Sequence, residues 1–198
     1  MHDVGIYENL ILGIHFLLLK KCKIFDEKTI VRCYTGRSMR INVRKHERRG
    51  YQSIKMSNIL EKQFLKQRND FEKSCVERDK KYHFPQGVIF ETDIAYAKDK
   101  NKAHRLDRYR PKGKEAQILP VIINVHGGGL LLGNKEFNKY FCALLSKKGF
   151  LVYSMEYRLI PDCTFFDQLR DIFLAMDFVK EHAAADGGDL SHVYLVGD

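Results

Sequence analysis

The feature that most constrains this chain is an apolar run that ends directly in a cluster of glycines. Residues Leu119–Val125 are almost continuously apolar, and His126-Gly127-Gly128-Gly129 follow at once. A short run of this kind is typical of a strand buried on both faces of a sheet. Glycine permits positive φ and leaves its backbone N–H uncovered. Such N–H groups can bind an oxygen that becomes negative during acyl transfer, so an oxyanion hole is one interpretation of the pattern.

Two phosphate-binding interpretations of the same glycines fail on spacing. A dinucleotide fingerprint that starts at Gly127 requires glycine at position 132, where the chain has Leu132. A phosphate loop fits from Gly128 to Gly133, but Asn134 then stands where lysine is required, and Lys135 comes one position late. A plain tight turn remains open as the alternative.

The pattern around the glycines predicts alternating strands and helices from about residue 86 onward. Strands are expected at 88–96, 106–110, 119–125, 150–157 and 192–196, and helices at 137–148 and 167–182. This alternation favours right-handed crossovers and a mainly parallel sheet. Residues 1–85 differ, since they contain no proline before Pro85 and their apolar residues have helical spacing. We therefore divide the chain into a basic, mainly helical segment (1–85) and an α/β segment (86–198).

A helix is predicted from about Gln52 to Lys80 by its apolar spacing. The apolar face consists of Met56, Ile59, Leu60, Phe64, Phe71 and Cys75, and the opposite face carries Lys62, Lys66, Arg68, Lys73 and Arg78.

The positive charge of the chain lies in its first part. The net charge is +9, and residues 1–110 hold 25 Lys/Arg against 14 Asp/Glu. Eight basic residues fall between Arg32 and Lys55, with Glu47 as the one acid, but Tyr34 and Tyr51 are the only aromatic residues among them. Without a recognisable nucleic-acid module, this pattern favours a solvated helix surface over nucleic acid. An anionic partner or membrane surface stays open.

Cysteine usage and hydropathy favour a cytoplasmic protein. The five cysteines are widely spaced and include no C-x-x-C pair, so neither a disulfide framework nor a zinc site is indicated. Scattered thiols suit a reducing compartment. The apolar run Leu10–Leu19 is too short for a transmembrane helix, which needs about 20 residues. It follows Asp3 and Glu8, unlike a signal peptide. A packed helix is favoured, while a lipid- or substrate-facing helix and an anchor stay open, and no stable membrane insertion is expected.

Five motifs, in chain order, resemble those of the hormone-sensitive-lipase-like esterases. They are Leu106–Pro111, His126–Gly133, Glu156–Asp162, Asp171, and Gly187-Gly188-Asp189 followed by Val193–Asp198. The resemblance covers about residues 87–198 and implies an α/β-hydrolase fold whose first half is preceded by a cap or lid segment. One departure is Phe166, where the family usually has proline.

The resemblance implies hydrolysis of small carboxylic esters by a serine nucleophile, without a metal or organic cofactor. The N–H groups of Gly127 and Gly128 would then hold the oxyanion, and His126 would belong to the loop. Chain order in this fold is nucleophile, acid, histidine. The whole triad is therefore expected after Asp198, and the 198-residue chain alone is expected to be inactive. Ser38 lacks the second glycine of a nucleophile motif.

Other interpretations remain beside the esterase. Some proteins that resemble this family have lost a catalytic residue and bind small ligands only. An amidase or peptidase on the same scaffold also stays open, as does the oligomeric state.

Arg158 and Asp171 are expected to form a buried pair that braces a helix against the sheet. Tyr157 is expected in the core or behind the site.

Overall fold

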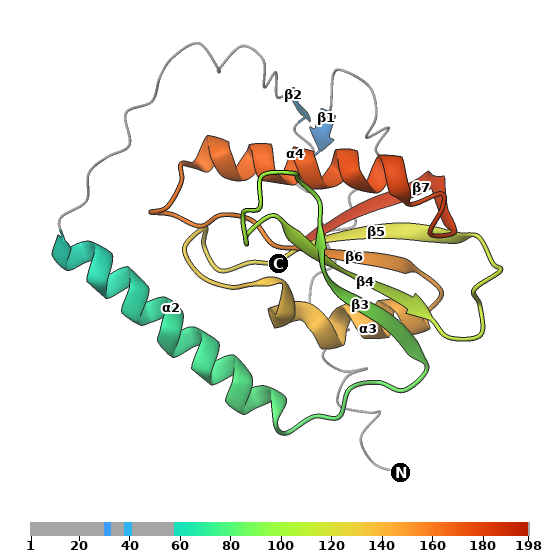
Figure 1. Cartoon of the computed structure of the whole chain (residues 1–198), viewed down its shortest axis with the longest axis horizontal. Helices are drawn as coiled ribbons and strands as arrows, with labels where there is room; N and C mark the ends of the chain where they lie inside the picture. The colour runs from blue at the N-terminus through green and yellow to red at the C-terminus, as the bar shows by residue number, and fades with distance from the viewer. Residues whose placement is uncertain (1–29, 33–37, 41–57, 198) are drawn as a thin grey trace.

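The computed structural model describes residues 30–32, 38–40 and 58–197 (Figure 1). The apolar run Leu10–Leu19, most of the basic run between Arg32 and Lys55, and Met56 lie outside the described residues. The first described elements are the strands β1 (Ile30–Arg32) and β2 (Ser38–Arg40), which pair antiparallel. Helical spacing did not predict this pair.

Five strands form the main sheet, in the spatial order β3-β4-β6-β5-β7. Their bounds are Val88–Ala95 (β3), Arg105–Pro111 (β4), Leu119–Val125 (β5), Leu151–Met155 (β6) and Gly188–Gly197 (β7). The pairings of β5 with β6 and β7 are parallel, whereas β3 with β4 and β4 with β6 are antiparallel. The sheet is therefore mixed, and the prediction of a mainly parallel sheet holds only for its β6-β5-β7 part.

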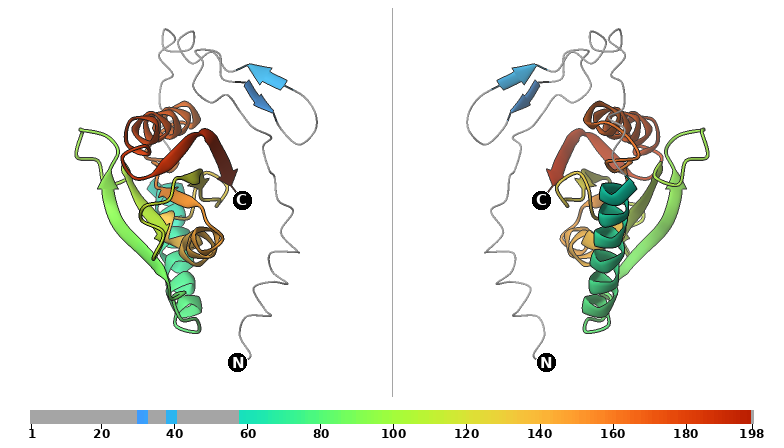
Figure 2. Two further views of the ribbon diagram at one scale, coloured as in Figure 1. Left: turned by 90° about the vertical axis from the view of Figure 1, so that its right-hand side faces the viewer. Right: turned by 90° about the vertical axis from the view of Figure 1, so that its left-hand side faces the viewer.

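Helices cover both faces of this sheet (Figures 1 and 2). The helix α3 (Lys139–Lys147) follows a short 3-10 turn, η2 (Lys135–Asn138), and α4 (Phe165–His182) follows β6. Alternate side chains of β6 enter different cores: Tyr153 packs with α4 residues such as Val179, and Val152 packs with α3 residues such as Cys142. This alternation is the period of a strand. It explains why the central strands are apolar throughout.

The helix α4 begins at a capping box. The Thr164 side chain accepts a hydrogen bond from the Asp167 backbone, and the Asp167 carboxylate accepts one from the Thr164 N–H at 2.8 Å. These bonds satisfy backbone donors that the first helical turn leaves without partners. The Thr164 hydroxyl also donates to the Asp167 carboxylate, at 2.6 Å, and this bond together with that from the Thr164 N–H holds the pKa of Asp167 below its ordinary value. The cap fixes where α4 starts, and Phe166 in place of the family's proline leaves the helix start intact.

The helix α2 (Asn58–Asp79) lies beside the loops at one end of the sheet (Figure 1). Its half-buried face consists of Phe64, Arg68, Phe71, Cys75, Arg78 and Asp79. Phe71 packs on Phe137 with ring centroids 5.2 Å apart. Assigning Arg68 and Arg78 to the opposite face was therefore wrong, and Ile59 and Leu60 are exposed. On this face, guanidinium groups that hydrogen-bond to backbone carbonyls therefore lie beside apolar contacts such as that of Phe71. The predicted division of the chain into a helical segment (1–85) and an α/β segment (86–198) stays a prediction.

Within the described part of the chain, no helix is both long and apolar enough to cross a membrane.

Candidate active site

Three parallel strands end side by side at one edge of the sheet. Val125 pairs with Met155 of β6 and with Gly197 of β7. The glycine loop leaves β5 at this point, and the Glu156-Tyr157 segment leaves β6 next to it. Ligands of open α/β sheets bind at the carboxyl ends of the strands. The topology therefore brings the predicted oxyanion loop and the predicted approach to the nucleophile to the same place.

The loop needs glycine at particular positions. Gly128 has φ 121°, and a Cβ there would lie 2.1 Å from the Leu132 carbonyl oxygen. Gly133 has φ 94°, and a Cβ there would meet the Gly127 oxygen at 2.5 Å and the His126 ring at 2.6 Å. Both positions combine a left-handed backbone with a close approach that only glycine tolerates.

Two backbone N–H groups of the loop are unused. Among the hydrogen bonds of the described residues, none has the N–H of Gly128 or Gly129 as its donor. Gly127 differs, because it accepts a bond from His126 and makes a further interaction. Adjacent unused donors are what an oxyanion site requires. Gly128 and Gly129 therefore have donors available for such a site, whereas the resemblance implied Gly127 and Gly128.

His126 anchors the loop and is not placed as a base. Its Nδ1 lies 2.9 Å from the Gly127 carbonyl oxygen, and its Nε2 lies 2.9 Å from Glu156 Oε1. Both ring nitrogens therefore face protein oxygens inside the loop region. The ring stacks on Tyr157 at 4.4 Å, and the Tyr157 hydroxyl donates to the His126 carbonyl at 2.7 Å. The predicted burial of Tyr157 is confirmed.

Glu156 ties the two ends of the loop together. One of its oxygens contacts His126, and the other accepts the Lys135 backbone N–H at 3.0 Å. The Lys135 side chain is buried and pairs with Asp107 at 2.8 Å. Burial lowers the pKa of Lys135, but hydrogen bonds to Asp107 and Glu136 outweigh it, so the pKa stands above its ordinary value. Lys135 therefore has a structural role. This agrees with its position in the sequence, which is one residue too late for the lysine of a phosphate loop.

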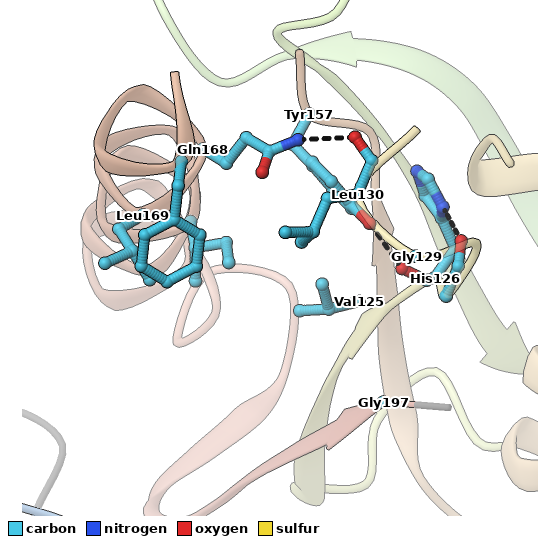
Figure 3. A pocket seen from close by; sticks show the side chains of 11 residues that line it. Val125, His126, Gly129, Leu130, Tyr157, Gln168, Leu169 and Gly197 are labelled. Carbon is cyan, nitrogen blue, oxygen red and sulfur yellow. Dashed lines mark hydrogen bonds between the residues drawn. The ribbon is translucent and has the colours of Figure 1, made fainter. Parts of the chain in front are cut away.

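A pocket of about 300 Å³ opens beside the glycines (Figure 3). Its lining consists of Val125, His126, Gly127, Gly129, Leu130, Tyr157, Phe165, Gln168, Leu169, Ile172 and Gly197. The walls are mostly apolar, and one of them is the α4 face that carries Phe165, Leu169 and Ile172. An apolar cleft with a few convergent polar groups is the usual form of a small-molecule site.

Gln168 braces the loop from α4. Its Nε2 donates to the carbonyl oxygens of Leu130, at 2.9 Å, and Arg158, at 3.0 Å. Since both partners are acceptors, these bonds fix the orientation of the amide. Leu130 also accepts the Ile160 N–H at 3.0 Å. The loop after β6 and the oxyanion loop are therefore held together at Leu130.

The predicted pair of Arg158 and Asp171 is confirmed. The Arg158 Nε lies 2.9 Å from Asp171 Oδ2, and its Nη2 lies 2.7 Å from Oδ1. Asp171 is fully buried, and the bidentate bond raises the pKa of Arg158. The pair joins the loop after β6 to α4.

One serine, histidine and aspartate cluster occurs near the start of β7, but it is not a triad. His192 Nδ1 lies 2.6 Å from Asp189 and 3.0 Å from the Ser191 hydroxyl. A catalytic histidine holds its acid and its serine with opposite ring nitrogens. Here one nitrogen contacts both, and the hydroxyl donates to Asp189 at 2.6 Å. The hydrogen bonds from Ser191 and His192 hold the pKa of Asp189 near 2, as in a tight surface turn.

The sequence located the loop but missed much of what supports it. Glu156 lies inside the motif Glu156–Asp162, but the motif alone gave this residue no role. Its position directly before Tyr157 is a signal that could have identified it as part of the site. Gln168, Leu169 and Ile172 gave no signal beyond helical spacing. Their role depends on which face of α4 lies over the end of β5.

The sheet order and the loops at the ends of its parallel strands define the class of protein, an α/β-hydrolase. Residues 106–198 match the BD-FAE family model. Isoprenylcysteine alpha-carbonyl methylesterase ICME of Arabidopsis thaliana is 31% identical over 94 residues, which are 48% of this chain and 22% of the relative. The crystal structure of esterase B from Lactobacillus Rhamnosis superposes with a TM-score of 0.62 and 30% identity, covering 70% of this chain and 45% of that one.

The same esterase B has also been solved inhibited by a C4-C4 tributyrin phosphonate. That structure superposes with a TM-score of 0.61 and 31% identity, over 70% of this chain and 46% of that one. The chain is thus related to carboxylesterases with the α/β-hydrolase fold, and the predicted fold class is confirmed. It spans about a fifth of the length of the curated relatives that it matches.

Proposed function

We propose that this chain supplies the oxyanion half of a serine carboxylesterase. The observation that carries the proposal is the pair of unused N–H groups of Gly128 and Gly129, beside an apolar pocket and the end of β7. In this proposal the serine follows Asp198, in a sequence that continues with a small residue and glycine. We call the protein with that continuation the extended protein.

The chemistry assigned to this chain is stabilisation of charge. When the serine oxygen attacks the ester carbonyl, the carbonyl oxygen becomes negative. The N–H groups of Gly128 and Gly129 would donate to it, together with the N–H that follows the serine. The Glu156 carboxylate and the His126 ring would hold the loop in place through their contacts at 2.9 Å and 3.0 Å.

The pocket supports a small ester as the substrate. Its volume of about 300 Å³ is at the lower end of the range for ligand sites. Phe165, Leu169 and Ile172 offer an apolar surface to an acyl chain. The esterase B relative, inhibited by a C4-C4 phosphonate, supports short acyl chains in the same way. We propose esters of short aliphatic acids and, from the scattered thiols, a cytoplasmic location.

The test is hydrolysis of 4-nitrophenyl butyrate by the extended protein. We expect saturable turnover that a serine-directed phosphonate abolishes. Replacing the serine after Asp198 by alanine should remove turnover and keep the melting temperature. A protein that binds butyrate esters without turning them over would instead be the small-ligand receptor, which the esterase relatives do not favour.

A further inference from the structure

The Arg68 side chain attaches the helix α2 to the loops of the site. This helix lies outside residues 106–198, the part that matches the BD-FAE family model. Arg68 of α2 donates from Nε to the Leu131 carbonyl at 2.8 Å and from Nη1 to Asp162 Oδ2 at 2.8 Å, and its Nη2 donates to the Ile160 carbonyl. The Arg68 side chain is only 13% exposed. Its bonds to the two carbonyls are part-buried, whereas the bond to Asp162, whose side chain is 62% exposed, lies at the surface.

The three acceptors of Arg68 belong to the two loops that form the site. Leu131 is in the oxyanion loop, and its own N–H donates to the Gly128 carbonyl at 3.2 Å. Ile160 and Asp162 are in the loop after β6, and the Ile160 N–H donates to the Leu130 carbonyl at 3.0 Å. The guanidinium group therefore joins both loops next to the places where they already contact one another.

The shape of arginine suits this task. A guanidinium is planar and presents five N–H donors in a fixed fork, whereas a lysine ammonium is a compact charge on a flexible stem. Here the fork engages two carbonyls and one carboxylate from different loops. A lysine could keep the charge beside Asp162 but could not hold all three acceptors in one geometry.

We propose that Arg68 is a positioning residue that holds the oxyanion loop in its reactive conformation, with α2 docked as a fixed brace. This inference rests on the proposed function, because it assumes that the Gly128 and Gly129 N–H groups bind the oxyanion.

Arg78 provides the matched control. It lies on the same half-buried face of α2, three turns further along, and donates to the Phe137 carbonyl at 3.1 Å. Its guanidinium also lies 5.0 Å from the centre of the Phe137 ring. Arg78 thus holds α2 to η2 without touching either loop of the site. Loss of Arg78 weakens the docking of the helix, whereas loss of Arg68 also releases the loops.

The first experiment needs no enzymatic activity. Amide hydrogen exchange is measured in the 198-residue chain for Arg68→Gln, Arg68→Lys and Arg78→Gln. We expect the Leu132 and Ile160 amides to exchange about tenfold faster in Arg68→Gln, because a local opening that releases the loops becomes easier. Arg68→Lys should fall between Arg68→Gln and the parent, and Arg78→Gln should leave both amides unchanged. Unchanged exchange in Arg68→Gln, or an equal rise in Arg78→Gln, would overturn the proposal.

The second experiment separates positioning from general stability in the extended protein. A misplaced oxyanion donor should lower kcat by about 10- to 100-fold and leave KM within about twofold. We expect this split in Arg68→Gln, a smaller loss in Arg68→Lys, and parent values in Arg78→Gln. If Arg68→Gln does not fold, Arg68→Lys gives the same comparison.

Equal changes in kcat and KM, or a parent kcat, would refute the role of Arg68. Lack of turnover in the parent would refute the proposed function. The exchange result would still test whether Arg68 holds the two loops together.

Discussion

Replacing Gly128 by alanine perturbs the oxyanion loop directly. The φ of 121° is unfavourable for any side chain, and the new Cβ would lie 2.1 Å from the Leu132 carbonyl oxygen. An ordinary contact needs more than an ångström of additional separation, so the backbone around Gly128 must move. The Gly128 N–H then no longer points where the oxyanion forms.

The size of the effect follows from the donor that is lost. Removing one oxyanion donor typically costs about 2.7–4 kcal/mol of transition-state stabilisation, which is about 10²- to 10³-fold in kcat. The left-handed backbone adds about 1–2 kcal/mol of strain to the folded state. We therefore expect Gly128→Ala in the extended protein to lose at least about 100-fold in kcat while its fold survives.

The control for this strain is Gly113→Ala. Gly113 has φ 82°, and a Cβ there would meet nothing within 4 Å. It lies in the turn between β4 and β5, away from the glycine loop. This variant should lose only the stability that the left-handed backbone costs, about 1–2 kcal/mol, and keep the parent kcat for 4-nitrophenyl butyrate. A parent kcat in Gly128→Ala would refute the assignment of the loop.

Three further predictions concern the pocket, α4 and the sheet edge. Leu169→Phe should narrow the pocket and shift the acyl preference of the extended protein from butyrate toward acetate, measured as the ratio of kcat/KM. Thr164→Ala should lower the free energy of unfolding by about 1 kcal/mol. The lowered pKa of Asp167 means that this capping contribution is present above pH 4 and lost as the pH falls through that pKa, which acid titration of unfolding would detect. Among the described strands β7 pairs only with β5, so light scattering should show that the 198-residue chain associates, and a stable monomer would contradict this.

The sequence predicted the strands well because the central ones are buried on both faces. The strand 119–125 has the predicted bounds, and the other four strands overlap the predicted ranges. Pairing direction was not predictable in the same way, since the alternation of β4 side chains is the same beside a parallel or an antiparallel neighbour. The order β3-β4-β6 comes from contacts between segments that lie far apart in the chain.

The site was predicted where a motif determines the backbone and missed where contacts span the chain. Three consecutive glycines identified the loop, because few other roles require them. The unused donors at Gly128 and Gly129 needed the folded loop to be identified. Arg68 was placed on a solvated face, because periodicity treats every charge as solvent-facing. Its acceptors lie 63 to 94 residues away in sequence.

The most direct test of the account is a structure of the extended protein with a phosphonate bound to its serine. The phosphoryl oxygen stands for the oxyanion of the tetrahedral intermediate. We predict that it accepts hydrogen bonds from the N–H groups of Gly128 and Gly129 at about 2.7–3.1 Å, with its alkyl chain against Leu169 and Ile172. A phosphonate on another residue, or an oxygen turned away from both glycines, would contradict the account.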